Sequence, residues 1–333
     1  MSAGQSGGDW RPTCTREALA QRAAWLAAIR RFFAERGVLE VETPLLGQTA
    51  PPDPHLRTFV THFRRPGTTV ALRLFLQSSP EFAMKRLLAA GSGSIFQICK
   101  AFRNEEWGRL HNPEFTLLEW YRVGFSLPQL MDEIAALLAV LGREHRALQT
   151  SERWAYADIF TRYVGVDPLD GTPGAFAARA RALGLPEAEA LCGEDRSLWL
   201  DLLFSHVVQP QLGHDRLCFV HAYPAILPSL ARRHPQDPRL VERVEVFWCG
   251  IELGNGFHEL SDAAEQEARF DADLARRRSL GLPAPPKDQR LLDALQCGLP
   301  DCSGVAIGLD RLFMLLLGKT ALAEVLTFPV ERA

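Results

Sequence analysis

The sequence predicts an α+β domain, in which a sheet is flanked by helices, and three observations lead to this fold class. Residues 22–36 and 127–141 read as helices, the first with an apolar stripe at helical spacing. Residues 95–105 and 116–122 read as two strands of period two around a polar loop. A short apolar strand within 301–312 runs directly into another helix.

Length and composition indicate a globular protein. The chain has 333 residues, of which 47% are hydrophobic, so a sizeable core can form. It contains no apolar run long enough to cross a membrane, and residues 1–19 lack the features of a signal peptide, which predicts a flexible N-terminal tail. Seven cysteines without a Cys-x-x-Cys pair favour reduced thiols in a cytoplasmic protein.

The net charge of −3 lowers the expectation of nucleic-acid binding. Proteins that hold a nucleic acid usually carry a marked basic patch, and here the densest basic run is Arg276-Arg277-Arg278. A local patch could still bind tRNA, so composition alone leaves this alternative open.

The remaining elements follow from local patterns. Residues 80–90 read as a helix whose first turn carries Pro80 and Glu81, a favourable start. Residues 142–240 are rich in Ala, Leu, Arg and Pro and are predicted to be helices separated by turns. A strand at 244–249 follows, and the turn-rich residues 283–286 precede the last helix and the strand within 301–312.

The hairpin is unusual because charged side chains occupy positions that are normally apolar. On a period of two, Arg103 and Glu105 would share one face of the first strand, and Glu119 and Tyr121 one face of the second. Such a face is costly to bury without a polar ligand, which indicates a binding site. A solvated face with cross-strand ion pairs is the alternative.

The segment 301–312 indicates a phosphate site. Gly304 and Gly308 remove side-chain bulk, so a ligand can approach the backbone. Arg311 would lie in the first turn of the following helix, where it is poorly placed for helix stability but well placed to hold a phosphate.

These segments resemble the motifs of class II aminoacyl-tRNA synthetases. Residues 102–105 carry the Phe-Arg-x-Glu of motif 2, and 304–311 carry the Gly-x-Gly-x-Gly-x-x-Arg of motif 3, with Ala306 at the middle glycine. Residues 22–44 match motif 1. The resemblance implies a mostly antiparallel sheet flanked by helices, a catalytic domain over 20–333 with a helical insertion at about 142–240, and a homodimer.

Within the class, the lysyl-tRNA synthetase core is most similar, through the segments 79–81, 111–116 and 252–260. An anticodon-reading OB-fold is not expected ahead of residue 22, since such a barrel needs far more chain.

The resemblance also implies the roles of individual residues, and Arg103 and Arg311 are expected to be catalytic. The residues expected to bind ATP are Arg103, Asn104, Glu105, His111, Asn112, Phe115, Glu252, Leu253, Gly308 and Arg311, with Glu252 as the ligand of Mg²⁺.

The same resemblance assigns the amino-acid pocket. Glu81 would bind the α- or β-ammonium group of a lysine-like substrate, and Glu119 and Glu259 the distal one. The full set expected to bind the substrate is Ser79, Pro80, Glu81, Glu119, Tyr121, Asn255, Glu259 and Ala306. An alanine at 306 places one extra methyl at the pocket wall, which is expected to alter the choice of amino acid.

The core without an anticodon domain, together with Ala306, resembles the truncated lysyl-tRNA synthetase paralogues that modify elongation factor P. That resemblance implies ATP-dependent activation of (R)-β-lysine, less well of α-lysine, and transfer to a lysine of elongation factor P. A minimal lysyl-tRNA synthetase acting on the tRNA acceptor stem is one alternative. A non-catalytic amino-acid sensor is another, and the presence of Arg103, Glu105, Glu252 and Arg311 weighs against it.

Overall fold

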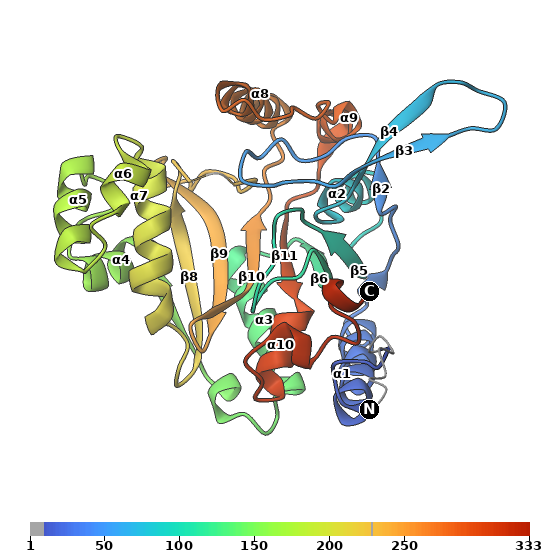
Figure 1. The fold of residues 1–333 in the computed structure, drawn as a ribbon, viewed down its shortest axis with the longest axis horizontal. Helices are drawn as coiled ribbons and strands as arrows, with labels where there is room; N and C mark the ends of the chain where they lie inside the picture. The colour runs from blue at the N-terminus through green and yellow to red at the C-terminus, as the bar shows by residue number, and fades with distance from the viewer. Residues whose placement is uncertain (1–9, 228) are drawn as a thin grey trace, which may run out of the picture.

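The protein is built around an eight-stranded sheet (Figure 1). The computed structural model describes residues 10–227 and 229–333. The strands of this sheet are β1 (Leu39–Glu40), β5 (Ile95–Phe102), β6 (Glu114–Val123), β7 (Ser151–Ala155), β8 (Leu217–Pro224), β9 (Leu240–Trp248), β10 (Ile251–His258) and β11 (Cys302–Gly308). Their spatial order is β1-β5-β6-β11-β10-β9-β8-β7, and only the two outermost pairs are parallel. The expected mostly antiparallel sheet is confirmed.

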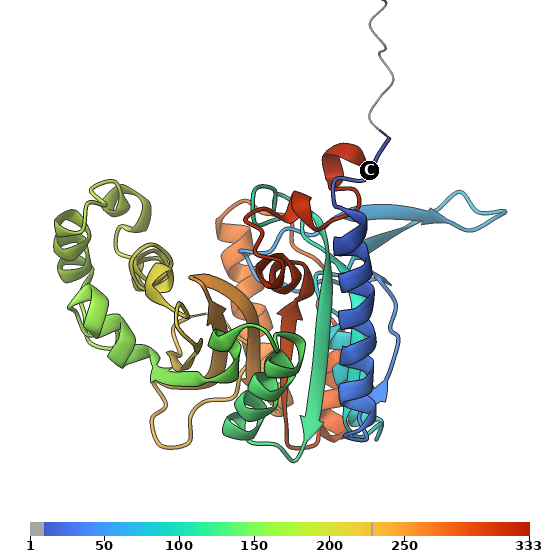
Figure 2. The ribbon, with the colours of Figure 1, turned by 90° about the horizontal axis from the view of Figure 1, so that it is seen from below.

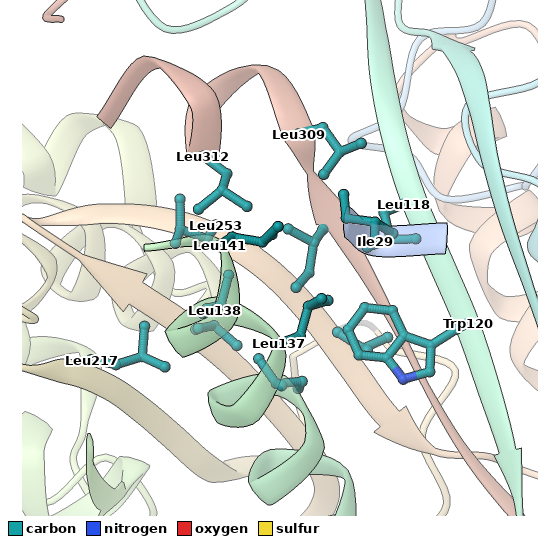
Figure 3. Close-up of a cluster of buried hydrophobic side chains, with 14 of the residues drawn as sticks. Ile29, Leu118, Trp120, Leu137, Leu138, Leu141, Leu217, Leu253, Leu309 and Leu312 are labelled. Atoms are coloured by element: carbon teal, nitrogen blue, oxygen red, sulfur yellow. The ribbon is translucent and has the colours of Figure 1, made fainter. Parts of the chain in front are cut away.

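One face of the sheet is covered by α1 (Arg16–Ala34), α3 (Leu127–Leu141) and α10 (Leu309–Leu316). Trp120, Ile29 and Leu137 belong to the apolar cluster between these helices and the strands (Figure 3). Because side chains alternate along a strand, Leu118 and Trp120 of β6 enter this core while Glu119 and Tyr121 face the opposite side. The packing of this core therefore fixes the register of β6, which places Glu119 and Tyr121 on the other face of the sheet.

That other face is packed by α2 (Glu81–Ala89), α8 (Ala263–Ser279) and α9 (Gln289–Gly298). Phe82, Phe270 and Leu292 form an apolar cluster there together with Tyr121. Sequence patterns did not reveal α8, whose N-cap Asp262 accepts a hydrogen bond from the backbone N–H of Glu265.

A third layer of helices lies against β8 and β9 (Figure 1). It contains α4 (Tyr156–Val164), α5 (Pro173–Ala182), α6 (Ala188–Cys192) and α7 (Arg196–Leu203). The expected helical insertion is therefore only part of 142–240, because β7 and β8 from this region extend the central sheet. The expectation failed for these strands because the local pattern does not show which segments find a partner strand.

A small second sheet has the order β2-β4-β3, from β2 (Leu46–Gly47), β3 (Val60–Arg64) and β4 (Ala71–Leu76). Its hairpin projects from the body of the protein (Figures 1 and 2). Single turns complete the chain, at Arg146–Gln149, Phe204–Val208, Gln209–Gln211, Leu322–Glu324 and Val330–Arg332. None of the helices in the described part of the chain is long and apolar enough to span a membrane.

Several expected boundaries need correction. The helix α1 begins at Arg16, inside the expected tail, since Thr15 caps it by accepting from the backbone N–H of Ala18; residues 1–9 of that tail lie outside the described residues. Strand β5 ends at Phe102, and Glu105 has a φ of 68°, so the prediction that Arg103 and Glu105 share a strand face is wrong. The helices predicted at 80–90 and 127–141 are confirmed within one residue.

Candidate active site

A cavity of about 690 Å³ opens on the polar face of β6, β11 and β10. Its walls come from α2, from the loop between β5 and β6, and from the start of α10. This volume lies in the range of pockets that enclose a small ligand.

The floor of the cavity is a row of side chains across three strands. Glu119 on β6 is the direct cross-strand neighbour of Ala306 on β11, which in turn neighbours Asn255 on β10. Cross-strand neighbours point to the same face, so the alanine methyl lies between a carboxylate and an amide. In the next row, a Cβ at Gly304 would lie 2.4 Å from ring carbons of Tyr121 and 2.9 Å from Glu259 Oε1, so glycine is required there.

At one end of the cavity, Glu119 is buried and held by two neutral donors. Ser79 donates to one carboxylate oxygen at 2.8 Å, and Tyr121 donates to the other at 2.7 Å. Burial, and next the charge of Glu81, raise the pKa of Glu119 to about 8. A cationic ligand that binds beside this buried carboxyl group would stabilise its ionised form.

A lysine completes this end of the cavity. Lys85, one turn after Glu81 on α2, is 2% exposed. Its Nζ donates to Glu81 Oε1 at 2.6 Å and lies 2.6 Å from Glu259 Oε2. Burial by itself lowers the pKa of Lys85, but Glu259 and Glu81 outweigh this and raise the pKa above its ordinary value. Burial also raises the pKa of Glu259 to about 7.

The opposite end of the cavity is cationic. Arg311, in the first turn of α10, donates to the backbone carbonyls of Leu110 and Glu252 at 3.2 and 3.0 Å. Its third nitrogen lies 2.7 Å from His111 Nε2, which requires a neutral ring nitrogen as acceptor. Burial, and next the charge of Arg311, lower the pKa of His111 in agreement with that state. The guanidinium is thus oriented by neutral acceptors and keeps its charge for an anionic ligand.

Arg103 also lines the cavity, and its charge, like that of Arg311, acts on His111. Its guanidinium is 5.1 Å above the ring of Phe115, and its nearest acidic partner is Glu106, at 3.6 Å. The Nε of Arg103 is buried and finds no hydrogen-bond acceptor among the described residues. A buried donor without an acceptor is costly, so this position suits a ligand that brings oxygen atoms.

Asn255 is oriented by a neighbouring arginine. Arg243 donates from Nε to Asn255 Oδ1 at 3.2 Å, and because guanidinium groups only donate, the amide orientation is fixed. The amide N–H groups of Asn255 can then donate to a hydrogen-bond acceptor of a ligand, such as a carboxylate or phosphate oxygen.

The acidic residue nearest to Arg311 is Glu252, whose Oε2 lies 3.9 Å from Arg311 Nη1. Within residues 10–227 and 229–333, no group of three or more His, Cys, Asp or Glu side chains could hold a metal ion. A single carboxylate fits Mg²⁺ only when phosphates and waters supply the other oxygens.

Comparison with known proteins shows the family of this chain. The family model for tRNA synthetases class II (D, K and N) matches residues 8–332. The chain belongs to this family. Relatives from Salmonella dublin and Salmonella heidelberg, both named elongation factor P–(R)-β-lysine ligase, are 49% identical over 324 residues, which is 97% of this chain and 98% of each relative.

The class II synthetase site contains most of the residues predicted from the sequence. The predicted residues that line the cavity are Ser79, Glu81, Arg103, His111, Asn112, Phe115, Glu119, Tyr121, Glu252, Leu253, Asn255, Glu259, Ala306, Gly308 and Arg311. The structure does not bring Asn104, Glu105 or Pro80 to the cavity surface. Glu105 turns outward because of its positive φ and pairs with Arg57, and Pro80 lies behind the cavity at the start of α2.

Sequence reasoning missed two residues that line this cavity, Glu106 and Arg243, and a third, Lys85, that contacts two of the lining carboxylates. Glu106 reaches the cavity in place of Glu105, because the strand ends earlier than its pattern suggested. Arg243 is a charged residue within a predominantly apolar strand, which was a usable signal. Lys85 follows Glu81 by four residues on a predicted helix, a spacing that predicts an ion pair.

Proposed function

We propose that this ligase of the class II synthetase family uses ATP to activate (R)-β-lysine and transfers it to a lysine side chain of elongation factor P. The observation that carries the proposal is one cavity that joins an arginine-lined end to an end lined by Glu81, Glu119 and Glu259. Phosphates fit the first end and a substrate with two ammonium groups fits the second. The names of the relatives support this substrate and acceptor.

In the first step, the amino-acid carboxylate attacks the α-phosphorus of ATP, an acyl–phosphate bond forms, and pyrophosphate leaves. Arg103 would bind the α-phosphate and the attacking carboxylate, and Arg311 the γ-phosphate. Glu252 would hold Mg²⁺, which neutralises phosphate charge when bound. No general base is needed, because the carboxylate is already ionised.

In the second step, the neutral ε-amine of the acceptor lysine attacks the acyl carbon, an amide forms, AMP leaves, and the amine loses a proton to solvent. We also propose that the reaction takes place in the cytoplasm, since its acceptor is a translation factor.

A labelling experiment tests the acceptor. The protein is incubated with ATP, Mg²⁺ and labelled β-lysine, and is offered elongation factor P and bulk tRNA separately. Label on the protein factor that survives mild alkali supports an amide-forming ligase. Alkali-labile label on tRNA would instead establish a minimal lysyl-tRNA synthetase, and a failure to form any adenylate would favour a non-catalytic sensor.

We also propose that the protein is a homodimer that pairs through α1 and β1. The edge strand β1 carries Leu39, which is 57% exposed. A second copy of the chain that packs against this edge would bury the apolar side chain. Sedimentation equilibrium distinguishes a dimer from a monomer.

Replacing Ala306 with Gly should relax the choice between the two lysine isomers. The methyl of Ala306 lies between Glu119 and Asn255 on the cavity floor, so its removal makes room for an amino group on the α-carbon. We expect the ratio of kcat/KM for α-lysine over β-lysine to rise by roughly 10-fold or more. ATP–pyrophosphate exchange measures this ratio, and Ala71→Gly on β4 controls for the cost of a glycine in a strand. An unchanged ratio would contradict the role of the methyl.

The affinity for β-lysine should rise with pH across the neutral range. Burial raises the pKa of Glu119 to about 8 and of Glu259 to about 7, so both carboxyl groups hold protons at lower pH. A protonated carboxyl cannot pair with an ammonium group, and ionisation above these pKa values restores the pairing. The KM for β-lysine in ATP–pyrophosphate exchange should therefore fall between about pH 6 and pH 8.5. A KM that is constant over this range would contradict this prediction.

A further inference from the structure

The candidate is Lys85, a buried cation that the reaction itself does not use. Its side chain is among the largest fully buried side chains of the protein. Among the described residues its ion-pair partners are Glu81 and Glu259, and both line the amino-acid end of the cavity. A lysine that only anchored α2 to the sheet would need neither of them, because α2 already packs through Phe82, Met84 and Leu88.

We propose that Lys85 is a positioning residue that sets the charge of the amino-acid pocket to match a substrate with two ammonium groups. This inference rests on the proposed function. Together with Glu81, Glu119 and Glu259, the ammonium of Lys85 leaves the ionised cluster with two net negative charges. Once its carboxylate is bonded to phosphate, the lysyl group carries two positive charges, so the pocket and its ligand neutralise each other.

The position of Lys85 also decides where the substrate cations bind. Its Nζ lies 2.6 Å from both Glu81 Oε1 and Glu259 Oε2, so it fills the space between these two carboxylates. A substrate ammonium group cannot occupy that space and must approach the outer oxygens instead. Glu259 Oε2 is buried against the ammonium of Lys85, so the lysine occupies this oxygen.

The groups around Lys85 make the charge balance sensitive to its removal. Without its ammonium, the pKa of Glu259 would rise further, because Lys85 is the cation that lowers it, so the cluster would hold more protons at neutral pH. The thiols nearby do not compensate, since burial raises the pKa of Cys302 far above neutrality and that of Cys99 to about 12. The titratable groups that interact with Lys85 and these carboxylates are Cys99 on β5, Tyr121 on β6 and Cys302 on β11. Arg243 on β9 and Asp273 on α8 line the same cavity.

The test compares Lys85→Met, which removes the charge, with Lys85→Arg, which keeps it. The readout is the pH profile of KM for β-lysine in ATP–pyrophosphate exchange. For Lys85→Met we expect the KM for β-lysine to be about 10- to 100-fold higher at pH 7, with a smaller change in kcat. The KM should recover towards pH 9, because the extra proton on the carboxyl groups must leave before the substrate binds. For Lys85→Arg we expect the wild-type profile at a raised KM. Lys100→Met, which removes an exposed lysine of β5, is the control.

A merely structural lysine would give a different result. Both variants would then raise KM equally at every pH and lower the unfolding temperature alike, and that outcome would overturn the proposal. If Lys85→Met does not fold, Lys85→Gln takes its place, because glutamine is also uncharged but can donate hydrogen bonds to the buried carboxyl groups. A KM for β-lysine in Lys85→Gln that stays at the wild-type value at pH 7, or that does not recover towards pH 9, would overturn the proposal. A wild type that activates no diamino acid would instead refute the proposed function.

Discussion

Replacing Arg311 with Ala should lower ATP–pyrophosphate exchange by roughly 10³-fold, and replacing Arg103 should do the same. Each guanidinium lies at the cavity surface, where the carboxylate of Glu106 is 3.6 Å from Arg103 and that of Glu252 is 3.9 Å from Arg311. Each is expected to bind a different phosphate. The loss should appear mainly in kcat, because these contacts strengthen as charge shifts during phosphoryl transfer.

The control for both variants is Arg181→Ala, which removes an exposed arginine that pairs with Glu189 outside the cavity. Its exchange rate should equal that of the wild type. Arg311→Lys separates charge from shape, because lysine retains the charge but cannot donate to Leu110 and Glu252 together. Exchange that survives in either alanine variant would refute the catalytic assignment of that arginine.

Replacing Glu119 with Gln should raise the KM for β-lysine by roughly 100-fold while leaving the KM for ATP unchanged. Glutamine has the same shape, but it removes the negative charge that the distal ammonium group needs. The fold should tolerate this change, because the raised pKa of Glu119, about 8, means that the free protein already holds this group largely uncharged at neutral pH. The unfolding temperature should therefore move little.

Glu114→Gln is the matched control, since Glu114 lies on the same strand but is exposed and pairs with Lys100. Its KM for β-lysine should not change. Glu119→Gln should also weaken the dependence of KM on pH, because one of the two titrating carboxyl groups is gone. An unaltered KM in Glu119→Gln would show that the distal ammonium group binds elsewhere.

Local sequence patterns predicted much of the fold correctly. The helix at 127–141 and the strand that begins at Ile95 were predictable because each depends on the spacing of its own apolar residues. The helical tract within 142–240 also has local causes. Its strands do not, since β7 is a strand because it pairs with β8, and β8 because it also pairs with β9.

The sequence by itself determined which chemical groups the site contains. Arg103 and Arg311, together with the carboxylates at 81, 119 and 259, stand in ordered motifs that can be recognised before any contact is known. The tertiary structure decided how these groups act. Glu105 turns away from the cavity and Glu106 enters it, because the strand ends at Phe102.

The charge of the pocket was also decided by the tertiary structure. Lys85 and Glu259 are far apart in the chain and meet only when α2 packs against the end of β10 and β11. Three glutamates in a sequence therefore suggest three free carboxylates, whereas the folded protein neutralises one of them. The physical reason is that a buried charge takes its properties from its neighbours in space, and long-range packing selects those neighbours.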